Sequence, residues 1–473
     1  MSVVTGKNWA IYNGDVAEIA KTIAGERFDA VLCDPPYGLS FMGKRWDISV
    51  PSVELWREVF AVLRPGAPVL AFGGTRTYHR LAVAIEDAGF EIRDCIAWIY
   101  GSGFPKSLNV SKAIDKTNGD ERPVVGAYKG ASNIGKGSTN SYITSERGKQ
   151  TDVIVTEAAS AASAAWDGYG TALKPAFEPC LLARKPLDGT MVANVTAHGV
   201  GAINVDGTRI GWAGPEDAAA AATGFADSRA RGTATQSQSI GRESRDGINR
   251  YNPDDLAGRW PANVTLDETS AALLDAQAGD RPGMSGGGNH AADYGGGMFG
   301  AIDCSHTARN DSGGPSRFFY VAKANRFERE FGCETLPFRS AGETVDREEG
   351  SAGQQSPSAG AGRTSGSRNH HPTVKPIALA KWLATLILPP PRTNGKPRRL
   401  LVPFSGSGSE MIGALRAGWD EVVGIELDPA FVEIAAHRLR RWEEVGSHIE
   451  PDELERAGEA DARQVSLFAK LGS

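Results

Sequence analysis

The stretch DAVLCDPPYGLSF, residues 29–41, changes abruptly from an apolar run to a carboxylate, two prolines and an aromatic ring. The apolar residues 30–33 predict a buried strand, and the tetrapeptide DPPY, residues 34–37, stands at its carboxyl end. Near the other end of the chain RRLLVPFSGSGSE, residues 398–410, passes in the same way from an apolar run into alternating glycine and serine. We therefore expect two strands whose ends line one cleft and carry the chemistry of the protein.

Short apolar runs alternate with helical patterns at both ends of the chain. The expected strands are residues 30–33, 68–72, 90–100, 174–186, 317–323, 399–402 and 421–425. The expected helices are residues 53–63, 78–88, 376–388, 410–417 and 430–442. This alternation predicts an α/β fold of the Rossmann-like type, with a mostly parallel sheet that is built from both chain ends.

Between the two ends the periodicity is weak and glycine and serine are frequent, which predicts a large central insertion. The predicted parts are residues 1–187, with a loop excursion at about 118–165, the insertion 188–365, with flexible segments, residues 366–445 and an acidic tail, 446–473. The first and third parts are expected to form one domain.

The composition is that of an ordinary globular protein of 473 residues, of which 41% are hydrophobic and 23% charged. No run of 18 apolar residues is present, and residues 1–20 lack the pattern of a signal peptide. The five cysteines form no CxxC pair, which predicts reduced thiols, a cytoplasmic location and no metal site.

The net charge is −6, but residues 365–442 contain eleven Lys and Arg against six Asp and Glu. This local excess predicts a surface that faces phosphate groups.

The glycine-rich turn after residues 399–402 is suited to a closely bound ligand. Gly406 and Gly408 permit close approach of the backbone, and the helix that follows offers free N–H groups. Glu426 ends the next strand, where an acid can bind ribose hydroxyls. Many α/β proteins have such a turn, but FSGSGS lacks the pyrophosphate cradle of GxGxxG. The pattern favours a nucleoside without a diphosphate, such as S-adenosylmethionine.

The DPPY tetrapeptide offers acceptors for an amino group. The Asp34 carboxylate and the Pro35 carbonyl are two acceptors, and the rings of Pro35 and Pro36 fix the backbone that holds them. The ring of Tyr37 offers a face on which a planar base can stack. Two acceptors on an exocyclic amino group favour a nitrogen whose lone pair points at an electrophilic methyl group. A duplex hides that group, so the base has to be flipped out. The alternative is that DPPY is only a capped turn.

Several segments together resemble those of an amino-methylating DNA methyltransferase of the β type, in which the catalytic motif precedes the cofactor motif. They are NGDVAEIAKTI (13–23), DPPY (34–37), AFEPCLLARKP (176–186), SRFFYVAKANRFER (316–329), HPTVKP (371–376), FSGSGS (404–409) and GIELDP (424–429). The resemblance covers about residues 8–110, 170–200 and 317–442, and it points to the family of N6-adenine and N4-cytosine enzymes.

The resemblance implies a fold of the S-adenosylmethionine-dependent methyltransferases, with S-adenosylmethionine as cofactor and double-stranded DNA as partner. It implies catalytic roles for Asp34, Pro35, Pro36 and Tyr37. The implied cofactor-binding residues are Asp15, Thr373, Lys375, Phe404, Ser405, Gly406, Ser407, Gly408, Glu426 and Asp428. Asp at the first catalytic position resembles the adenine enzymes more often than Ser does, so adenine N6 is favoured over cytosine N4.

One position departs from the family pattern, because Val402 stands where the family turn usually begins with Asp. A catalytically inactive DNA-binding relative is therefore an alternative to an active enzyme. Methylation of protein glutamine or RNA is a third reading, but those relatives usually place the glycine turn before the Pro-Pro-aromatic motif. The recognition sequence, a companion restriction nuclease and the oligomeric state, with a homodimer as one option, are left open.

The expected DNA contacts lie outside these motifs. Lys44 and Arg45 follow the DPPY motif and are candidates for contacts to DNA phosphates. The insertion 188–365 is expected to recognise the target sequence through base edges in the major groove. Within it the candidate DNA contacts are Arg209, Arg229, Arg231, Arg242 and Arg245, with a solvated arginine face as the alternative. Trp260 is expected in a core rather than in a stack with a base.

Overall fold

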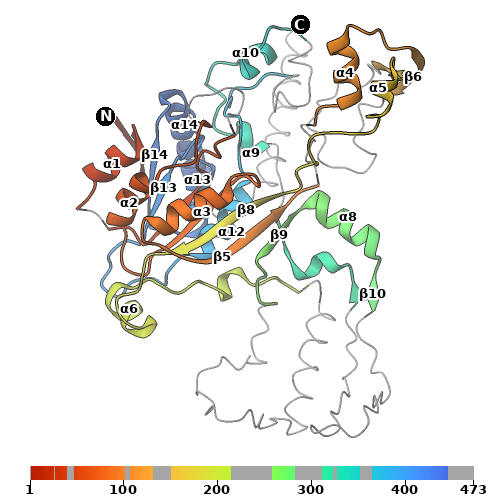
Figure 1. Ribbon diagram of the computed structural model, residues 1–473. Helices are drawn as coiled ribbons and strands as arrows, with labels where there is room; N and C mark the ends of the chain where they lie inside the picture. The colour runs from red at the N-terminus through yellow and green to blue at the C-terminus, as the bar shows by residue number, and fades with distance from the viewer. Residues whose placement is uncertain are drawn as a thin grey trace, which may run out of the picture. The chain divides into compact units, whose positions relative to one another are not determined.

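The computed structural model describes residues 2–25, 27–39, 47–101, 107–130, 151–212, 214, 258–282, 312–322, 327–351 and 365–445. The chain forms two compact units, of which the first comprises residues 1–204, 267–269 and 322–473 and the second residues 205–266 and 270–321 (Figure 1). No helix in the described ranges is long and apolar enough to cross a membrane. The four cysteines within these ranges are free thiols.

The first unit is built around a mostly parallel sheet. Its strands follow the order β1 (Ser2–Thr5), β2 (Trp9–Asn13), β14 (Glu421–Glu426), β13 (Arg399–Pro403), β3 (Ala30–Cys33), β4 (Pro68–Phe72), β8 (Phe177–Arg184) and β5 (Glu91–Ile99). In this order the strands from β2 to β4 are parallel to one another, whereas β1 and β8 are antiparallel to their neighbours. The predicted α/β fold, with a mostly parallel sheet built from both chain ends, is confirmed.

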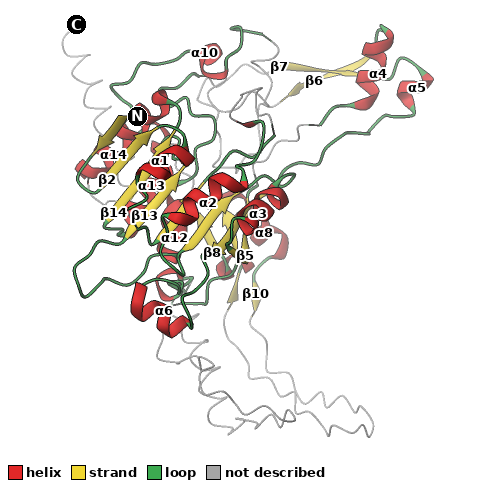
Figure 2. Ribbon diagram, turned by 60° about the vertical axis from the view of Figure 1, so that its left-hand side comes forward, coloured by secondary structure: helices red, strands yellow, loops and turns green. Residues whose placement is uncertain are grey.

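Two groups of helices cover the two faces of this sheet (Figures 1 and 2). The first group contains α1 (Val16–Thr22), α2 (Val53–Ala61) and α3 (Tyr78–Asp87), and the second α12 (Ile377–Leu386), α13 (Ser409–Ala417) and α14 (Pro429–Val445). In β3 the side chains of Val31 and Cys33 join the apolar core that contains Trp56 of α2 and Ile85 of α3. Leu32 between them is equally buried, and the two-residue period of a strand directs it to the opposite face. The continuous apolar run of the sequence thus reflects burial on both faces.

Further elements of the first unit lie outside this sheet. β6 (Val124–Gly130) and β7 (Thr151–Thr156) pair antiparallel, and α4 (Val110–Asn118) packs against α5 (Ala161–Ala164). These elements occupy much of the described part of the segment that was expected to be a loop excursion, 118–165. The same unit contains α6 (Met191–His198), α9 (Phe327–Glu330) and α10 (Ala341–Val345).

The second unit contains short elements. They are η3 (Asp206–Thr208), β10 (Arg281–Pro282), β11 (Ser312–Gly313) and η4 (Pro315–Phe318), with most of β9 (Val264–Asp267), α8 (Glu268–Ala278) and β12 (Tyr320–Ala322). Asp275 of α8 accepts hydrogen bonds from the N–H and the hydroxyl of Ser316 at 2.9 and 2.6 Å, which joins α8 to η4. The strand expected at 317–323 begins only at Tyr320, because Pro315 starts a 3₁₀ turn before it. The expected insertion 188–365 is divided between both units, and its role stays a prediction.

Candidate active site

The DPPY motif and the glycine-rich turn, residues 404–409, follow two neighbouring strands of the sheet. β3 and β13 are parallel neighbours, with Ala30 opposite Leu400. Their carboxyl ends, Cys33 and Pro403, therefore lie at the same edge of the sheet. From β13 the strand order continues to β14, and from β3 it continues in the other direction to β4. Ligands of open α/β sheets bind beyond the carboxyl ends at such a reversal point. The expected proximity of the DPPY motif and the glycine-rich turn is confirmed.

The turn between β13 and α13 has a backbone that few residue types tolerate. Gly406 and Gly408 have φ angles of 49° and 82°, in the left-handed region that glycine enters without strain. A Cβ atom on Gly406 would lie only 2.6 Å from Nε2 of His371. Phe404 has a φ angle of 61°, which is an outlier for a bulky residue. Such strain is concentrated at functional sites.

Glu426 contacts this turn from the end of β14. Its Oε2 accepts the N–H of Gly406 at 2.8 Å, and its Oε1 accepts the N–H of Asp428 at 2.9 Å. Burial raises the pKa of the Glu426 carboxyl, although these two N–H groups act in the opposite direction. Each oxygen keeps a second lone pair for a ligand. The acid that was expected to bind ribose thus lies beside the glycine-rich turn.

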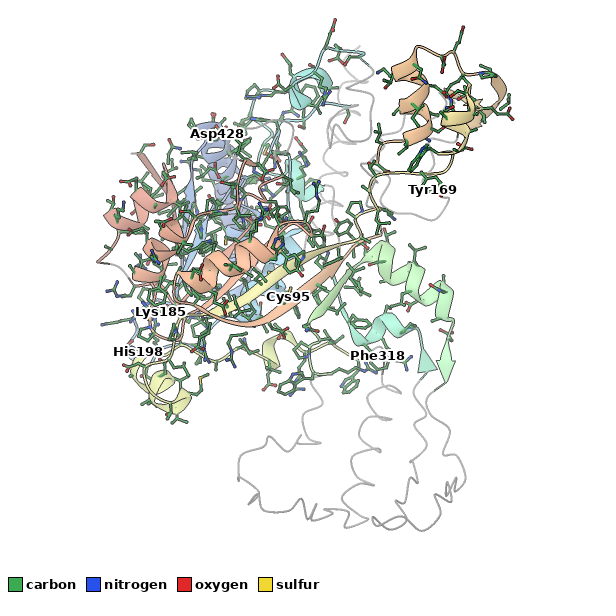
Figure 3. All side chains as sticks on the ribbon, viewed as in Figure 1. Cys95, Tyr169, Lys185, His198, Phe318 and Asp428 are labelled. Carbon is green, nitrogen blue, oxygen red and sulfur yellow. The ribbon has the colours of Figure 1, made fainter. Side chains whose placement is uncertain are left out.

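Asp15 and Asp428 stand at the beginnings of two helices near Glu426. Oδ1 of Asp15 accepts the N–H two residues later at 2.9 Å and caps α1. Oδ1 of Asp428, which is labelled in Figure 3, makes the same contact at 2.9 Å at the start of α14. The N–H of Gly14 donates to the carbonyl of Glu426 at 2.9 Å and joins the two loops. Both predicted residues therefore have a role as helix caps and border the same edge of the sheet.

Arg438 of α14 holds the turn from within the protein, and no sequence motif indicated it. Its fully buried guanidinium donates to the carbonyl and the hydroxyl of Ser407, to the hydroxyl of Ser409 at 3.2 Å and to the carbonyl of Glu328 at 2.9 Å. Ser405 of the turn is buried as well. The sequence feature that could have indicated Arg438 is its position, as a basic residue, on the apolar face of the expected helix 430–442.

Asp34, Tyr37 and Lys375 form a hydrogen-bonded cluster at the end of β3. Oη of Tyr37 donates to Oδ1 of Asp34 at 2.8 Å. Nζ of Lys375 donates to Oδ2 of Asp34 at 2.7 Å and to Oη of Tyr37 at 3.2 Å. Burial alone would lower the pKa of Lys375, but the carboxylates of Asp34 and Glu178 raise it above its ordinary value. The HPTVKP lysine is therefore a cation that faces the DPPY carboxylate.

Glu178 of β8 is a fourth member of this cluster, and sequence reasoning did not single it out. Its Oε2 lies 3.1 Å from Oη of Tyr37 and 3.1 Å from Nζ of Lys375. Because β8 is antiparallel to β4, its amino end reaches the edge at which β4 ends. The only signal was its place in the segment AFEPCLLARKP. Burial, followed by the charges of Asp34 and Glu178, raises the pKa of Tyr37 well above its ordinary value, so the hydroxyl keeps its proton.

Glu410 in the first turn of α13 is another acid that the sequence did not indicate. Its side chain is buried, and no side chain in the described ranges donates a hydrogen bond to it. Burial, followed by the charge of Asp34, raises the pKa of Glu410 to about 7, while Lys375 and Arg438 act in the opposite direction. Val402, where the family pattern has Asp, is fully buried in β13. The site therefore has an ionisable acid at position 410 and none at position 402.

The other predicted site residues are Thr373 at the cofactor and the candidate DNA contacts. Thr373 is exposed, and its carbonyl oxygen lies 2.8 Å from Nδ1 of His371. The candidate DNA contacts that lie outside the described residues are Lys44, Arg45, Arg229, Arg231, Arg242 and Arg245.

Trp260 in the second unit is exposed, so the expectation of a core position is wrong. Its exposed fraction is 51%, and the guanidinium carbon of Arg209 lies 5.5 Å from the ring centre. The guanidinium of Arg259 lies 4.7 Å from the ring centre of Trp212 and 4.8 Å from that of Phe318, which Figure 3 labels. Cations rather than an apolar layer flank these rings, and cation–π attraction stabilises such pairs. The guanidinium of Arg209 is largely buried and lies 2.8 Å from Oδ1 of Asp206, so its charge is already paired.

The side chains at this edge of the sheet suit a cationic nucleoside. Glu410 and Glu426 offer acceptors to the nucleoside, and the Glu410 carboxyl, when ionised, attracts its positive charge. In the described ranges no group of three or more His, Cys, Asp or Glu side chains is placed to hold a metal ion.

Comparisons with known proteins give one relative by sequence. Over 156 residues the chain is 30% identical to the type II methyltransferase M.HindIII of Haemophilus influenzae. The match covers 32% of this chain and 38% of that protein, so it spans well under two thirds of the relative. No protein-family model matches the chain.

Several solved structures resemble the chain only loosely. The cytosine-N4-specific PvuII DNA methyltransferase is 10% identical, with a TM-score of 0.36 and coverage of 96% of this chain and 92% of that chain. The M1.HpyAVI–SAM complex is 12% identical, with a TM-score of 0.33 and coverage of 90% and 98%. By sequence, the protein is similar to part of a type II methyltransferase.

Proposed function

We propose that the protein is a DNA methyltransferase of the β type that methylates an exocyclic amino group of a flipped base, with S-adenosylmethionine as methyl donor. The observation that carries this proposal is the position of the DPPY motif and the glycine-rich turn at adjacent strand ends. A donor held at the turn and a base held at DPPY then meet at one edge of the sheet. The similarity to M.HindIII supports the same activity.

The residues of the site have distinct roles in this proposal. Glu426, Asp15 and the turn at residues 404–409 hold the nucleoside, and Glu410 faces its positive charge. When bound, S-adenosylmethionine supplies an electrophilic methyl group. The Asp34 carboxylate and the Pro35 carbonyl accept the two hydrogens of the amino group, which directs the nitrogen lone pair at that methyl group. Asp34 keeps free lone pairs for this contact, because Tyr37 and Lys375 occupy only one site on each oxygen.

Transfer of a labelled methyl group tests the proposal. The purified protein is incubated with methyl-labelled S-adenosylmethionine and DNA of mixed sequence, and label in DNA, RNA and protein is counted. We expect label in DNA alone. Asp34→Ala should abolish transfer and leave cofactor affinity, measured by calorimetry, unchanged. A folded wild-type protein that binds DNA without transferring label would point to the inactive relative. Transfer by Asp34→Ala at the wild-type rate would show that the catalytic assignment is wrong.

We further propose adenine N6 as the methylated position, because Asp34 opens the catalytic motif. Nuclease digestion of the labelled DNA, followed by mass spectrometry of the nucleosides, distinguishes N6-methyladenine from N4-methylcytosine. Label in N4-methylcytosine alone would contradict the choice of base and leave the amino-methyltransferase activity standing.

The second unit is proposed to contribute to DNA recognition. It contains the exposed ring of Trp260, which packs against the largely buried guanidinium of Arg209, within the insertion 188–365. An exposed aromatic ring can stack on a base. Sequencing that reports modified bases, applied to DNA from cells that express the protein, would identify the recognition sequence.

A further inference from the structure

The hydroxyl group of Tyr37 lies between two carboxylates. Its Oη is 2.8 Å from Oδ1 of Asp34 and 3.1 Å from Oε2 of Glu178. Both distances are those of hydrogen bonds, but a hydroxyl group has only one hydrogen to donate. When both carboxylates are ionised, one of the two oxygen–oxygen contacts therefore has no hydrogen. Lys375 does not supply the missing hydrogen, because the hydrogens of its ammonium group lie between Nζ and the oxygens and not between two oxygens.

The cluster also has one negative charge in excess. Asp34 and Glu178 contribute two carboxylates, and Lys375 contributes one ammonium group, 2.7 and 3.1 Å from them. One added proton on either carboxylate supplies the missing hydrogen and brings the net charge to zero. Since an uncompensated charge is costly where water is largely excluded, the cluster is suited to accept one proton.

The proposed reaction releases one proton beside Asp34. The amino nitrogen forms a bond to the methyl carbon, the bond between that carbon and sulfur breaks, and its electron pair stays on sulfur. The methylated nitrogen is then a cationic amine that carries two hydrogens. It becomes neutral when one of them leaves as a proton, and the nearest acceptor is the Asp34 carboxylate that already holds the amino group.

We propose that Glu178 is the final acceptor of this proton within the protein, a role that rests on the proposed function. Asp34 takes the proton from the nitrogen and passes it from Oδ1 to Oη of Tyr37. The hydroxyl hydrogen of Tyr37 passes at the same time to Oε2 of Glu178, so Tyr37 ends unchanged. The Glu178 side chain is 23% exposed, against 12% for Asp34, and it delivers the proton to water.

The other ionisable groups that interact with Glu178 do not compete for this proton. Tyr100 at the end of β5 and Cys180 of β8 both lie within its electrostatic reach. Burial raises the pKa of Tyr100 to about 12, and burial also raises the pKa of Cys180 well above its ordinary value. Both are therefore neutral donors near pH 7. Lys375 is already protonated, and Glu178 is the remaining base beside Tyr37.

Two measurements in one single turnover test the relay. Methyl transfer is followed by rapid acid quench, and proton release by an indicator dye in weak buffer. In the wild type both should proceed at the same rate. In Glu178→Gln and in Tyr37→Phe, proton release should lag behind methyl transfer by about tenfold or more, since a positioned acid–base group contributes about 10²–10⁴-fold. Formate should remove the lag in Glu178→Ala. A purely structural role would slow both rates together and would not respond to formate.

The matched control is Glu421→Gln, since Glu421 is a sheet carboxylate paired with Arg399 at 2.7 Å, at the other end of its strand from Glu426. It should release protons and transfer methyl groups as the wild type does.

The contact between Tyr37 and Glu178 can be tested without cofactor or DNA. Loss of the Glu178 charge in Glu178→Gln should lower the pH at which Tyr37 ionises in a spectrophotometric titration. Equal rates of methyl transfer and proton release in Glu178→Gln would overturn the relay and leave the proposed function intact. Absence of methyl transfer in the wild type would overturn both.

Discussion

Nζ of Lys375 lies 2.7 Å from Oδ2 of Asp34, although 341 positions separate the two residues in the sequence. The contact joins the HPTVKP segment to the DPPY motif and balances part of the charge of two largely buried carboxylates. The Lys375 side chain is 6% exposed, so water cannot replace its contribution. The arrangement of the proposed base-binding acceptors therefore depends on a residue that was expected at the cofactor.

The first prediction concerns this ammonium group. Lys375→Met should lower the free energy of unfolding by about 3–5 kcal/mol, because loss of one partner leaves buried carboxylates uncompensated. Methyl transfer should fall by about 100-fold or more, since the Asp34 carboxylate then loses the ammonium group that holds it in position. Chemical denaturation and single-turnover rates measure the two effects. Lys396→Met, at an exposed lysine, is the control, and equal behaviour of both variants would exclude the role of Lys375.

The second prediction concerns the pH dependence of stability at Glu410. Its pKa is raised from 4.5 to about 7 in the folded protein, so folding favours the protonated form. The stabilisation from this group is complete below about pH 4.5 and is lost as the pH rises through about 7. Glu410→Gln should remove this loss. Denaturant unfolding without ligand, at a series of pH values, gives the slope of the free energy of unfolding against pH for the wild type and for Glu410→Gln. The exposed Glu433→Gln is the control. Identical slopes in wild type and Glu410→Gln would be inconsistent with a buried acid that titrates there.

The third prediction concerns the support of the glycine-rich turn by Arg438. Arg438→Ala leaves the acceptors on Ser407, Ser409 and Glu328 without their donor. We expect a loss of about 3 kcal/mol or more in the free energy of unfolding. Cofactor affinity, measured by calorimetry on folded protein, should fall as well. Arg440→Ala, at an exposed position of the same helix, should change neither quantity. Unchanged affinity in folded Arg438→Ala would contradict the supporting role.

The fourth prediction concerns the backbone at Gly406. Alanine there would have to adopt φ of 49° with its Cβ 2.6 Å from the His371 ring. The left-handed conformation alone costs about 1–2 kcal/mol, so Gly406→Ala should weaken cofactor binding by about tenfold or more. Gly126→Ala is the control, because a Cβ at that position meets no atom within 4 Å and its φ is not positive. Cofactor affinity equal to that of the wild type would mean that the turn does not contact the ligand.

The fifth prediction concerns DNA binding by the second unit. Trp260→Ala should weaken DNA binding by about tenfold, since one stacked base contributes about 1–3 kcal/mol. Cofactor affinity should stay unchanged, because the glycine-rich turn and Glu426 belong to the first unit. Fluorescence anisotropy with labelled duplexes measures the effect. Leu273→Ala, at an exposed residue of α8, controls for loss of apolar surface, and an equal effect there would argue against a specific role of Trp260.

Local patterns predicted most of the central sheet correctly. β3 and β4 begin and end where the apolar runs 30–33 and 68–72 do, because each run is flanked by residues that stop a strand. β1 and β2 were not predicted as strands, since SVVT and WAIYN are short and lie in a polar context. β6 and β7 were missed for the same reason, beside a long polar segment.

The site was predictable only where a motif marked it. DPPY and FSGSGS each follow an apolar run at a predicted strand end, so Asp34 and Gly406 could be proposed as site residues from sequence. Glu178, Glu410 and Arg438 could not, because a single acid or base in a strand or helix is usually a solvated surface residue. Their burial becomes visible only when the partner elements are in place.

The sequence by itself determined the alternation of strands and helices and the chemical character of two strand ends, because both follow from local periodicity and from the residues that end each run. Only the tertiary structure decided that β13 lies beside β3 and that β8 enters the sheet antiparallel beyond β4. Strand pairing between distant segments depends on burial against every neighbour at once, which no local pattern encodes. That pairing brings Lys375, Glu178 and Tyr37 around Asp34 and places the Tyr37 hydroxyl between two carboxylates.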